Sequence, residues 1–211
     1  MKRTSTSDAG NKHQQRTETT TRDLLAAAET VFVRDGYERA QIETIAAEAG
    51  RTRGAIYAHF KSKEDIFFAL METKAQGQLD LYVREAGDIP FDEKVATAHR
   101  LFLQTLKEEN WLILLLEFKL FALRNKASRD RIRNLIELLY NDISRDLLTD
   151  LGLNKTEKQL ALTAFTVLRS LPSAMALERR LNQGTCAAAP LRRVLDIVFQ
   201  AMVHIGHSPK S

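Results

Sequence analysis

The chain has 211 residues, of which 44% are hydrophobic and 27% are charged, and its formal net charge is +4 at pH 7. This length allows one large domain, or a small domain joined to a larger one, with a sizeable core. The single cysteine, Cys186, excludes an internal disulfide and fits a reducing compartment. The N-terminus has no apolar signal sequence, and the most apolar run, residues 111–123, is too short to cross a bilayer. We therefore expect a cytoplasmic protein with no membrane partner.

The N-terminal part of the chain is predicted to hold a polar tail and then a helix. Residues 1–18 lack apolar periodicity, so we expect a disordered tail with scattered basic side chains. Thr20 stands three residues before Asp23 in a capping-box pattern, which predicts the start of the first helix. Gly36 is expected to end it. The apolar stripe of this helix has helical spacing: Leu24, Ala28, Val31 and Phe32.

Two short helices separated by a glycine turn are predicted next. The first runs over residues 42–49 and is stopped by Gly50. Thr52 can cap the second, which is expected to reach Phe60. Ser62 then opens a longer helix. Two short helices at this spacing are typical of a helix-turn-helix.

Longer helices follow as far as the C-terminus, with no β-type alternation of useful length. Their expected ranges are 62–86, 92–109, 111–124, 129–151, 156–181 and 190–205. We therefore predict an all-α fold, with an N-terminal three-helix domain over residues 19–66 and a larger helical domain over residues 67–211.

The helix after Thr52 has an unusual outer face. When its residues are placed 100° apart, Ile56 and Phe60 fall on the inner side. The opposite side is nearly bare, because it carries Gly54, Ala55 and Ala58. Such a surface can enter the major groove of DNA, which is about 12 Å wide and has phosphates on both rims. The alternative is a plain exposed connector, because helix-turn-helix geometry also occurs without DNA binding.

Long polar side chains flank this bare face. Tyr57 and His59 stand on either side of it and can donate to phosphates on opposite rims. Arg53, in the first turn, can fork onto guanine O6 and N7. Lys63 and Arg22 add positive charge nearby. Residues 1–63 hold eleven basic and eight acidic side chains, which suits a polyanionic partner.

The segment TIAAEAGRTRGAIYAHFKSKEDIF, residues 44–67, resembles the TetR/AcrR family of transcriptional regulators, and the resemblance covers residues 20–70. It implies a three-helix DNA-binding domain followed by a helical domain that binds a small molecule and dimerises. Two positions depart from the family pattern: Gln41 replaces the usual threonine cap, and Arg51 replaces a residue that is often apolar. Arg51 either contacts DNA or is merely solvated. The candidate DNA-binding set is Arg22, Gln41, Arg51, Thr52, Arg53, Gly54, Ala55, Tyr57, His59 and Lys63.

The apolar run over residues 111–123 contains a carboxylate, Glu117. A buried charge is costly unless it is paired, so Glu117 either pairs with Arg124 or orients a ligand in an apolar pocket. Under the second interpretation, the effector is a largely apolar small molecule. Its candidate contacts are Trp111, Glu117, Phe118 and Phe121.

The last two helices are the expected dimerisation elements, because the resemblance implies a four-helix bundle between two copies. The residues available for this interface lie on apolar stripes. They are Leu162, Phe165, Leu191, Leu195, Val198, Phe199 and Met202. Such stripes also occur as ordinary core.

These features together predict a homodimeric repressor that a small molecule releases from a palindromic double-stranded DNA operator. The alternative is a DNA-binding regulator or activator without an effector. No nucleophile-base set is visible in the sequence, so we expect no enzyme activity and no cofactor. His204 and His207 could bind a metal, but a frayed terminus explains them as well, and no metal site is predicted.

Overall fold

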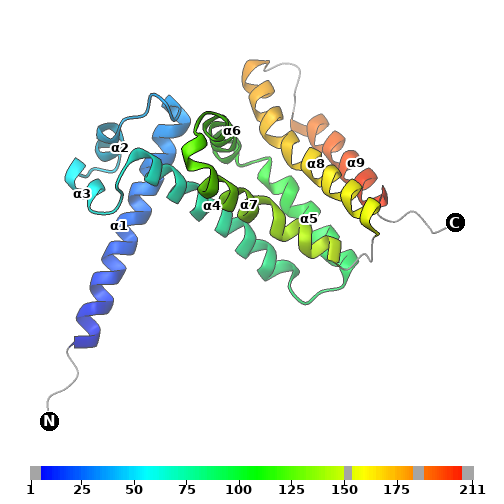
Figure 1. The fold of residues 1–211 in the computed structure, drawn as a ribbon, viewed down its shortest axis with the longest axis horizontal. Helices are drawn as coiled ribbons and strands as arrows, with labels where there is room; N and C mark the ends of the chain where they lie inside the picture. Colours follow the sequence, from blue (N-terminus) through cyan, green and yellow to red (C-terminus); the bar gives the residue numbers. More distant parts are fainter. Residues whose placement is uncertain (1–5, 150–153, 183–187, 206–211) are drawn as a thin grey trace, which may run out of the picture. The chain divides into compact units, whose positions relative to one another are not determined.

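The computed structural model describes the backbone of residues 6–149, 154–182 and 188–205. Within these ranges it describes the side chains outside residues 6–14, 139–147, 149, 188 and 201–205. All regular structure in the described residues is helical, which confirms the predicted all-α fold (Figure 1). The helices are α1 (Thr6–Asp35), α2 (Ile42–Glu48), α3 (Arg53–Tyr57), α4 (Lys63–Ala86), α5 (Phe91–Thr105), α6 (Glu109–Arg124), the 3-10 turn η1 (Lys126–Ser128), α7 (Arg129–Thr149), α8 (Lys155–Leu181) and α9 (Ala188–Ile205).

The chain divides into two compact units, and the division falls inside α4, between Met71 and Glu72. The sequence placed this boundary between residues 66 and 67. Ile66, Phe67, Phe68 and Met71 are all fully buried or nearly so, and the first turns of α4 therefore belong to the core of the first unit. Because the boundary lies inside one continuous helix, it has no glycine or proline that would mark it in the sequence.

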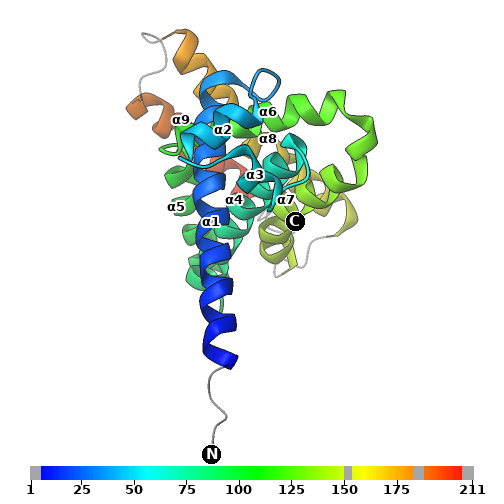
Figure 2. The same cartoon turned by 90° about the vertical axis from the view of Figure 1, so that its left-hand side faces the viewer.

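The first unit consists of α1, α2, α3 and the start of α4 around one small core. Figure 2 shows α2 and α3 beside the C-terminal half of α1, and α1 and α2 are in contact. At its centre three aromatic rings pack together, with the Phe32 and Phe67 centroids 5.2 Å apart and those of Tyr37 and Phe67 4.7 Å apart. Such contacts add to the apolar area that the rings bury. This core fixes where α3 sits.

The first helix begins earlier than predicted. It starts at Thr6, and the Thr20 hydroxyl donates to the Arg16 carbonyl inside the helix instead of capping its end. Residues 6–18 are therefore helical where a disordered tail was expected, and residues 1–5 lie outside the described residues. Once a helix is nucleated, each added residue contributes a hydrogen bond without needing to pack. Exposed turns of this kind leave no apolar periodicity in the sequence.

The second unit is a bundle formed by the rest of α4 and by α5 to α9. Contacts join α6 to α8, α8 to α9, and α5 to both α7 and α9. The helix α6 is apolar nearly all round and is the most deeply buried of them, with Leu114, Phe118 and Phe121 almost fully inaccessible. An all-round apolar helix is expected at the centre of such a bundle.

Candidate nucleic-acid interface and internal cavity

The turn between α2 and α3 follows directly from its residues. Gly50 has φ +61°, a left-handed conformation that glycine adopts without a steric cost. Thr52 then caps α3, because its Oγ1 accepts a hydrogen bond from the Ala55 N–H at 3.2 Å. At the start of α2, Gln41 makes no side-chain capping bond, which agrees with the weak cap expected there. The glycine and the threonine cap together set the direction of α3.

The outer face of α3 is open, as the helical wheel predicts. The helix is shorter than expected and ends at Tyr57, but Ile56 and Phe60 still pack inward and are buried. Gly54 and Ala58 are exposed, and Ala55 is half-buried. A Cβ added at Gly54 would meet only the Thr52 Oγ1, at 3.8 Å. No other described residue of the first unit covers this position.

Arg53 and Tyr57 lie together on the exposed side of α3. The Arg53 guanidinium lies 5.4 Å from the centre of the Tyr57 ring and donates to its hydroxyl at 3.3 Å. It also forms an ion pair with Glu43 of α2, with Nη1 and Oε1 2.8 Å apart. These bonds raise the pKa of Arg53, with the Tyr57 hydrogen bond as the largest cause and Glu43 next. Sequence reasoning missed Glu43, because only the packing of α2 against α3 brings it to this surface.

His59 is half-buried, and α1 holds it in place. Its Nδ1 lies 3.1 Å from the Thr21 Oγ1. When Thr21 donates to Nδ1, Nε2 carries the proton and can donate to a phosphate. The neighbouring Arg22 on α1 is exposed. Arg51 lies 3.8 Å from the Asp23 carboxylate, and both side chains are about half exposed, so this ion pair is weak.

Lys63 is placed differently from the expectation. Its Nζ donates to the carbonyls of Tyr37, Glu38 and Ala40 at 2.8, 3.0 and 3.0 Å, which uses all three N–H donors. Burial lowers its pKa. In this geometry the ammonium has no donor left for a phosphate. Lys63 instead fixes the loop between α1 and α2, a long-range contact that local spacing does not reveal.

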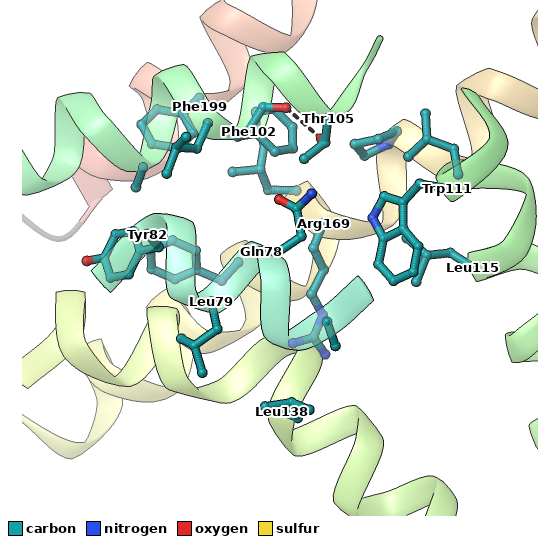
Figure 3. A pocket seen from close by; sticks show the side chains of 17 residues that line it. Gln78, Leu79, Tyr82, Phe102, Thr105, Trp111, Leu115, Leu138, Arg169 and Phe199 are labelled. Carbon is teal, nitrogen blue, oxygen red and sulfur yellow. Dashed lines mark hydrogen bonds between the residues drawn. The ribbon is translucent and has the colours of Figure 1, made fainter. Parts of the chain in front are cut away.

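The second unit contains a cavity of about 190 Å³. Most of its lining is apolar and comes from α4 to α9: Ala75, Gln78, Leu79, Tyr82, Ala98, Leu101, Phe102, Thr105, Trp111, Leu112, Leu115, Leu138, Phe165, Leu168, Arg169, Pro172 and Phe199. Figure 3 shows Gln78 in the middle of this lining, with Tyr82 and Phe199 to one side and Trp111 and Leu115 to the other, and the Arg169 side chain points away from the Gln78 amide, toward Leu138.

Of the four predicted ligand contacts, only Trp111 lines this cavity. Phe118 and Phe121 are buried core residues, and Glu117 does not line it either. The part of α6 that lines the cavity comprises Trp111, Leu112 and Leu115. Phe118 and Phe121 lie about two and nearly three turns beyond Trp111 along the helix. The lining residues Phe102, Phe165 and Phe199 were missed as ligand contacts, because an apolar residue on a helical stripe does not show whether it borders an empty space.

The predicted dimer residues also divide between two environments. Leu195 and Phe199 are buried inside the unit, and Phe165, which is half-buried, lines the cavity together with Phe199. Leu162 is exposed, and Leu191 and Val198 are half-buried. The side chain of Met202 lies outside the described residues. The large apolar side chains that are exposed on α8 and α9 are Leu160, Leu162, Val167, Leu177, Leu181, Val194 and Ile197.

The N-terminal unit is similar in sequence to known bacterial regulators. Residues 24–70 match the family described as bacterial regulatory proteins, tetR family. An uncharacterised HTH-type transcriptional regulator of Mycobacterium tuberculosis is 26% identical over 123 residues, which are 58% of this chain and 63% of that protein. The HTH-type transcriptional repressor BepR of Brucella suis is 48% identical over 48 residues, 23% of each chain. The chain thus matches less than two thirds of the length of these relatives.

The shared fold extends beyond the N-terminal unit. The crystal structure of the transcriptional regulator FadR from Bacillus subtilis, in complex with stearoyl-CoA, superimposes with a TM-score of 0.67. The superposition covers 86% of this chain and 96% of that one, at 23% sequence identity, and shows a common fold. The match over residues 24–70 assigns the helix-turn-helix of the first unit to the tetR family of bacterial regulatory proteins, which confirms the resemblance seen in the sequence.

Proposed function

We propose that the protein is a homodimeric transcriptional repressor of the cytoplasm, which binds a palindromic DNA operator and is released from it by a small molecule. The observation that carries this proposal is the α2–turn–α3 arrangement, in which a capped helix presents a bare strip with a cation beside it. No catalytic activity and no cofactor are part of the proposal. The repressor role draws on the similarity to BepR, which is a repressor by name.

In the proposed complex, α3 enters the major groove through Gly54, Ala55 and Ala58. Arg53 reads a guanine edge, because its planar fork matches O6 and N7. Tyr57 and His59 donate to phosphates on opposite rims, and the exposed N–H groups at the start of α3 attract a phosphate as well. Four further members of the predicted set are exposed and available to the same duplex: Arg22, Gln41, Arg51 and Thr52.

The proposed dimer uses α8 and α9, through residues that differ in part from the predicted ones. Leu160, Val167, Ala174 and Leu181 recur every seven residues on α8, so they lie on one face, and all four are exposed. Val194 and Ile197 expose a second apolar strip on the adjoining α9.

A membrane is the other apolar environment to consider, since α8 is long and apolar enough to cross one by length and composition alone. Its contacts with α6 and α9 within the bundle favour a protein partner instead. Pairing these strips with a second copy would cover them, and two copies would place two α3 helices on successive major grooves.

The cavity in the second unit is the proposed effector site. The dimer is proposed to have one form that binds DNA tightly and one that binds it weakly. A ligand that prefers the second form shifts the population toward it and lowers the DNA affinity, at most by the ratio of its affinities for the two forms. The cavity supports this proposal over the alternative of a regulator without an effector, because a well-packed core would leave few such voids.

The DNA-binding proposal is tested with a palindromic duplex selected from random sequence by the wild-type protein. Arg53→Ala is expected to weaken binding by roughly ten- to a hundredfold and to relax the preference at one base pair, since a bidentate contact is worth about 1–3 kcal/mol. Tyr57→Phe should weaken binding to all sequences alike by a few-fold. Arg133→Ala, an exposed arginine of the second unit, is the control. Equal affinity and preference in all three variants would remove the assignment of α3.

A further inference from the structure

We propose that the cavity binds small apolar carboxylates, with the anionic head group at Arg169 and the apolar tail against the aromatic wall. This inference names the ligand class of the proposed effector site. Only the role of this site in regulation rests on the proposed function. Binding itself is independent of DNA.

The volume of the cavity limits the size of the ligand. A cavity of about 150 Å³ holds a benzene molecule in a well-studied protein core, so a cavity of about 190 Å³ suits a ligand of roughly eight to ten non-hydrogen atoms. A straight-chain carboxylate of eight carbons is of this size. The wall opposite such a tail is formed by rings and aliphatic side chains, among them Tyr82, Phe102 and Phe199, which favour an apolar tail.

Two polar groups in the lining have no hydrogen-bond partner among the residues that the structure describes. These groups are the amide of Gln78 and the indole N–H of Trp111, which is itself 6% exposed. In contrast, the Thr105 hydroxyl donates to the Phe102 carbonyl at 2.7 Å and is already satisfied. Neither the amide of Gln78 nor the indole N–H of Trp111 is an inaccessible atom without a partner, and each can donate to a polar atom of a ligand that enters the cavity. The head group is therefore expected to be a hydrogen-bond acceptor.

The charge of the lining selects an anion. Arg169 is the one formally charged side chain among the described residues that line the cavity. Its guanidinium has five donors in a planar fork, which matches a carboxylate even when some donors have other partners. Lys119 of α6 is half-buried nearby, where it donates to Ser173 Oγ at 3.1 Å. Burial lowers the pKa of Lys119, and the positive charge of Arg169 lowers it further, which places two cations close together.

An aromatic wall can also hold a cation over the faces of its rings. A cationic ligand would have to enter beside Arg169, and the repulsion between like charges opposes that. The anion and the cation are thus distinguishable by experiment, and the geometry favours the anion.

Trp111 is the single tryptophan of the chain, so its fluorescence reports on this cavity alone. The full-length protein is titrated with octanoate, 1-octanol and octylammonium, which share one tail and differ in charge, and the heat of binding is measured in parallel. Octanoate is expected to bind at least about tenfold more tightly than 1-octanol, and octylammonium more weakly than either, because charge-assisted hydrogen bonds are the stronger ones.

Two variants test the role of Arg169. Arg169→Met keeps the length of the side chain and removes its charge, so the octanoate-to-octanol affinity ratio should fall to about one while 1-octanol still binds. Arg179→Met, on the same helix but outside the lining, is the matched control and should leave the ratio unchanged.

The inference is overturned if octylammonium binds as tightly as octanoate, if Arg169→Met leaves the ratio unchanged, or if none of the three ligands gives heat or a change in fluorescence. Its failure is distinguishable from that of the proposed function. Octanoate that binds without releasing DNA supports the ligand class and contradicts the effector role. DNA binding by a protein that takes up no ligand contradicts the ligand class and leaves the DNA-binding proposal intact.

Discussion

Arg53 contacts two side chains of its own chain, and they would affect DNA binding in opposite ways. Tyr57 stacks under the guanidinium and orients it outward on α3. Glu43 binds the same guanidinium and would have to release it for a guanine, besides adding a negative charge near the phosphates. The pair is exposed, so it costs little to break. We infer that Glu43 tunes the affinity of this surface.

Glu43→Gln is therefore expected to increase DNA affinity by a few-fold, because it frees Arg53 and removes one repulsive charge. The measurement is fluorescence anisotropy with the selected palindrome. Glu48→Gln is the control, since Glu48 lies on the same helix and pairs with Arg34 instead. An equal gain in the two variants would show that only net charge matters and would contradict a specific role for Glu43.

Two glycines of this surface are expected to respond differently to alanine. At Gly50 the added Cβ has free space, but φ is +61°, so Gly50→Ala should lower the free energy of unfolding by roughly 1–2 kcal/mol. At Gly54 the Cβ also has space and the residue is helical, so Gly54→Ala should leave stability unchanged or raise it. It should nevertheless weaken DNA binding, because a methyl group then stands on the strip that approaches the bases.

Urea unfolding followed by circular dichroism, with DNA binding measured on the same samples, checks this pair. A Gly54→Ala variant that binds DNA as tightly as the wild type would show that the strip is not in contact with DNA.

Between elements, Lys63 connects the start of α4 to the loop that joins α1 and α2. Its three hydrogen bonds are made by one charged group to three carbonyls, and the ammonium also lies 4.7 Å from the centre of the Tyr37 ring. This arrangement fixes the loop that leads into the helix-turn-helix. We therefore expect Lys63 to affect DNA binding only indirectly, through the position of α2.

Lys63→Met is expected to lower the free energy of unfolding by on the order of 1–3 kcal/mol, since three carbonyls, two of them partly buried, lose their charged donor. Lys61→Met removes an equal charge from an exposed neighbour and serves as the control. Urea midpoints of the two variants provide the test. If Lys63→Met weakens DNA binding more than Lys61→Met does while the two variants are equally stable, then Lys63 contacts DNA directly and does not act by fixing the loop.

His99 connects α5 to α9 in the second unit. It stacks on Phe199 with ring centres 4.3 Å apart, and its Nε2 lies 3.0 Å from Asp196 Oδ1, although not in hydrogen-bonding geometry. Burial lowers the pKa of His99, and this effect outweighs the opposing one of Asp196, with Arg192 lowering it slightly further. The folded state therefore favours the neutral ring.

Because the folded pKa lies below the unfolded value of about 6.5, the unfolded state binds more protons as the pH falls. The contribution of His99 to the free energy of unfolding should be fully present above about pH 6.5. It should decrease as the pH falls toward the pKa that His99 has in the folded state. His99→Gln should remove this part of the pH dependence, and Asp196→Asn should steepen it. Urea midpoints from pH 8 to pH 5 test both variants, and a shallower profile in Asp196→Asn would contradict the expected direction of the effect.

For the whole molecule, the exposed apolar strips of α8 and α9 are the feature that most needs a partner. Val167, Val194 and Ile197 are each about half exposed, on two helices that adjoin each other. Exposed apolar side chains on adjoining helices are expected where a partner binds. A second copy of the chain is the proposed occupant.

Val167→Glu combined with Ile197→Glu is expected to yield a monomer in sedimentation velocity, because charges would be buried without partners at the interface. The same variant should bind a palindrome far more weakly than the wild type, because a monomer contacts one half-site at a time whereas a dimer contacts both. Leu123→Glu, which changes the most exposed large apolar side chain of α6, is the control and should stay dimeric. A double variant that sediments as a dimer would place the interface elsewhere.

The local features of the helix-turn-helix could be predicted from the sequence because their causes lie within a few residues. Thr52 caps the helix that it precedes, Gly50 supplies the left-handed turn, and the spacing of Ile56 and Phe60 defines the buried side of α3. Each of these depends on backbone geometry over one or two helical turns. The all-α fold and most helix ranges follow from the same periodicity.

The tertiary structure alone decided which groups meet and which apolar side chains remain uncovered. Glu43 reaches Arg53 from another helix, and Lys63 reaches carbonyls more than twenty residues away. On α9, Phe199 faces a cavity while Val194 faces outward, although both belong to apolar stripes of one helix. Periodicity shows that a face is apolar, and the packing of neighbouring helices determines whether that face meets core, cavity or a partner.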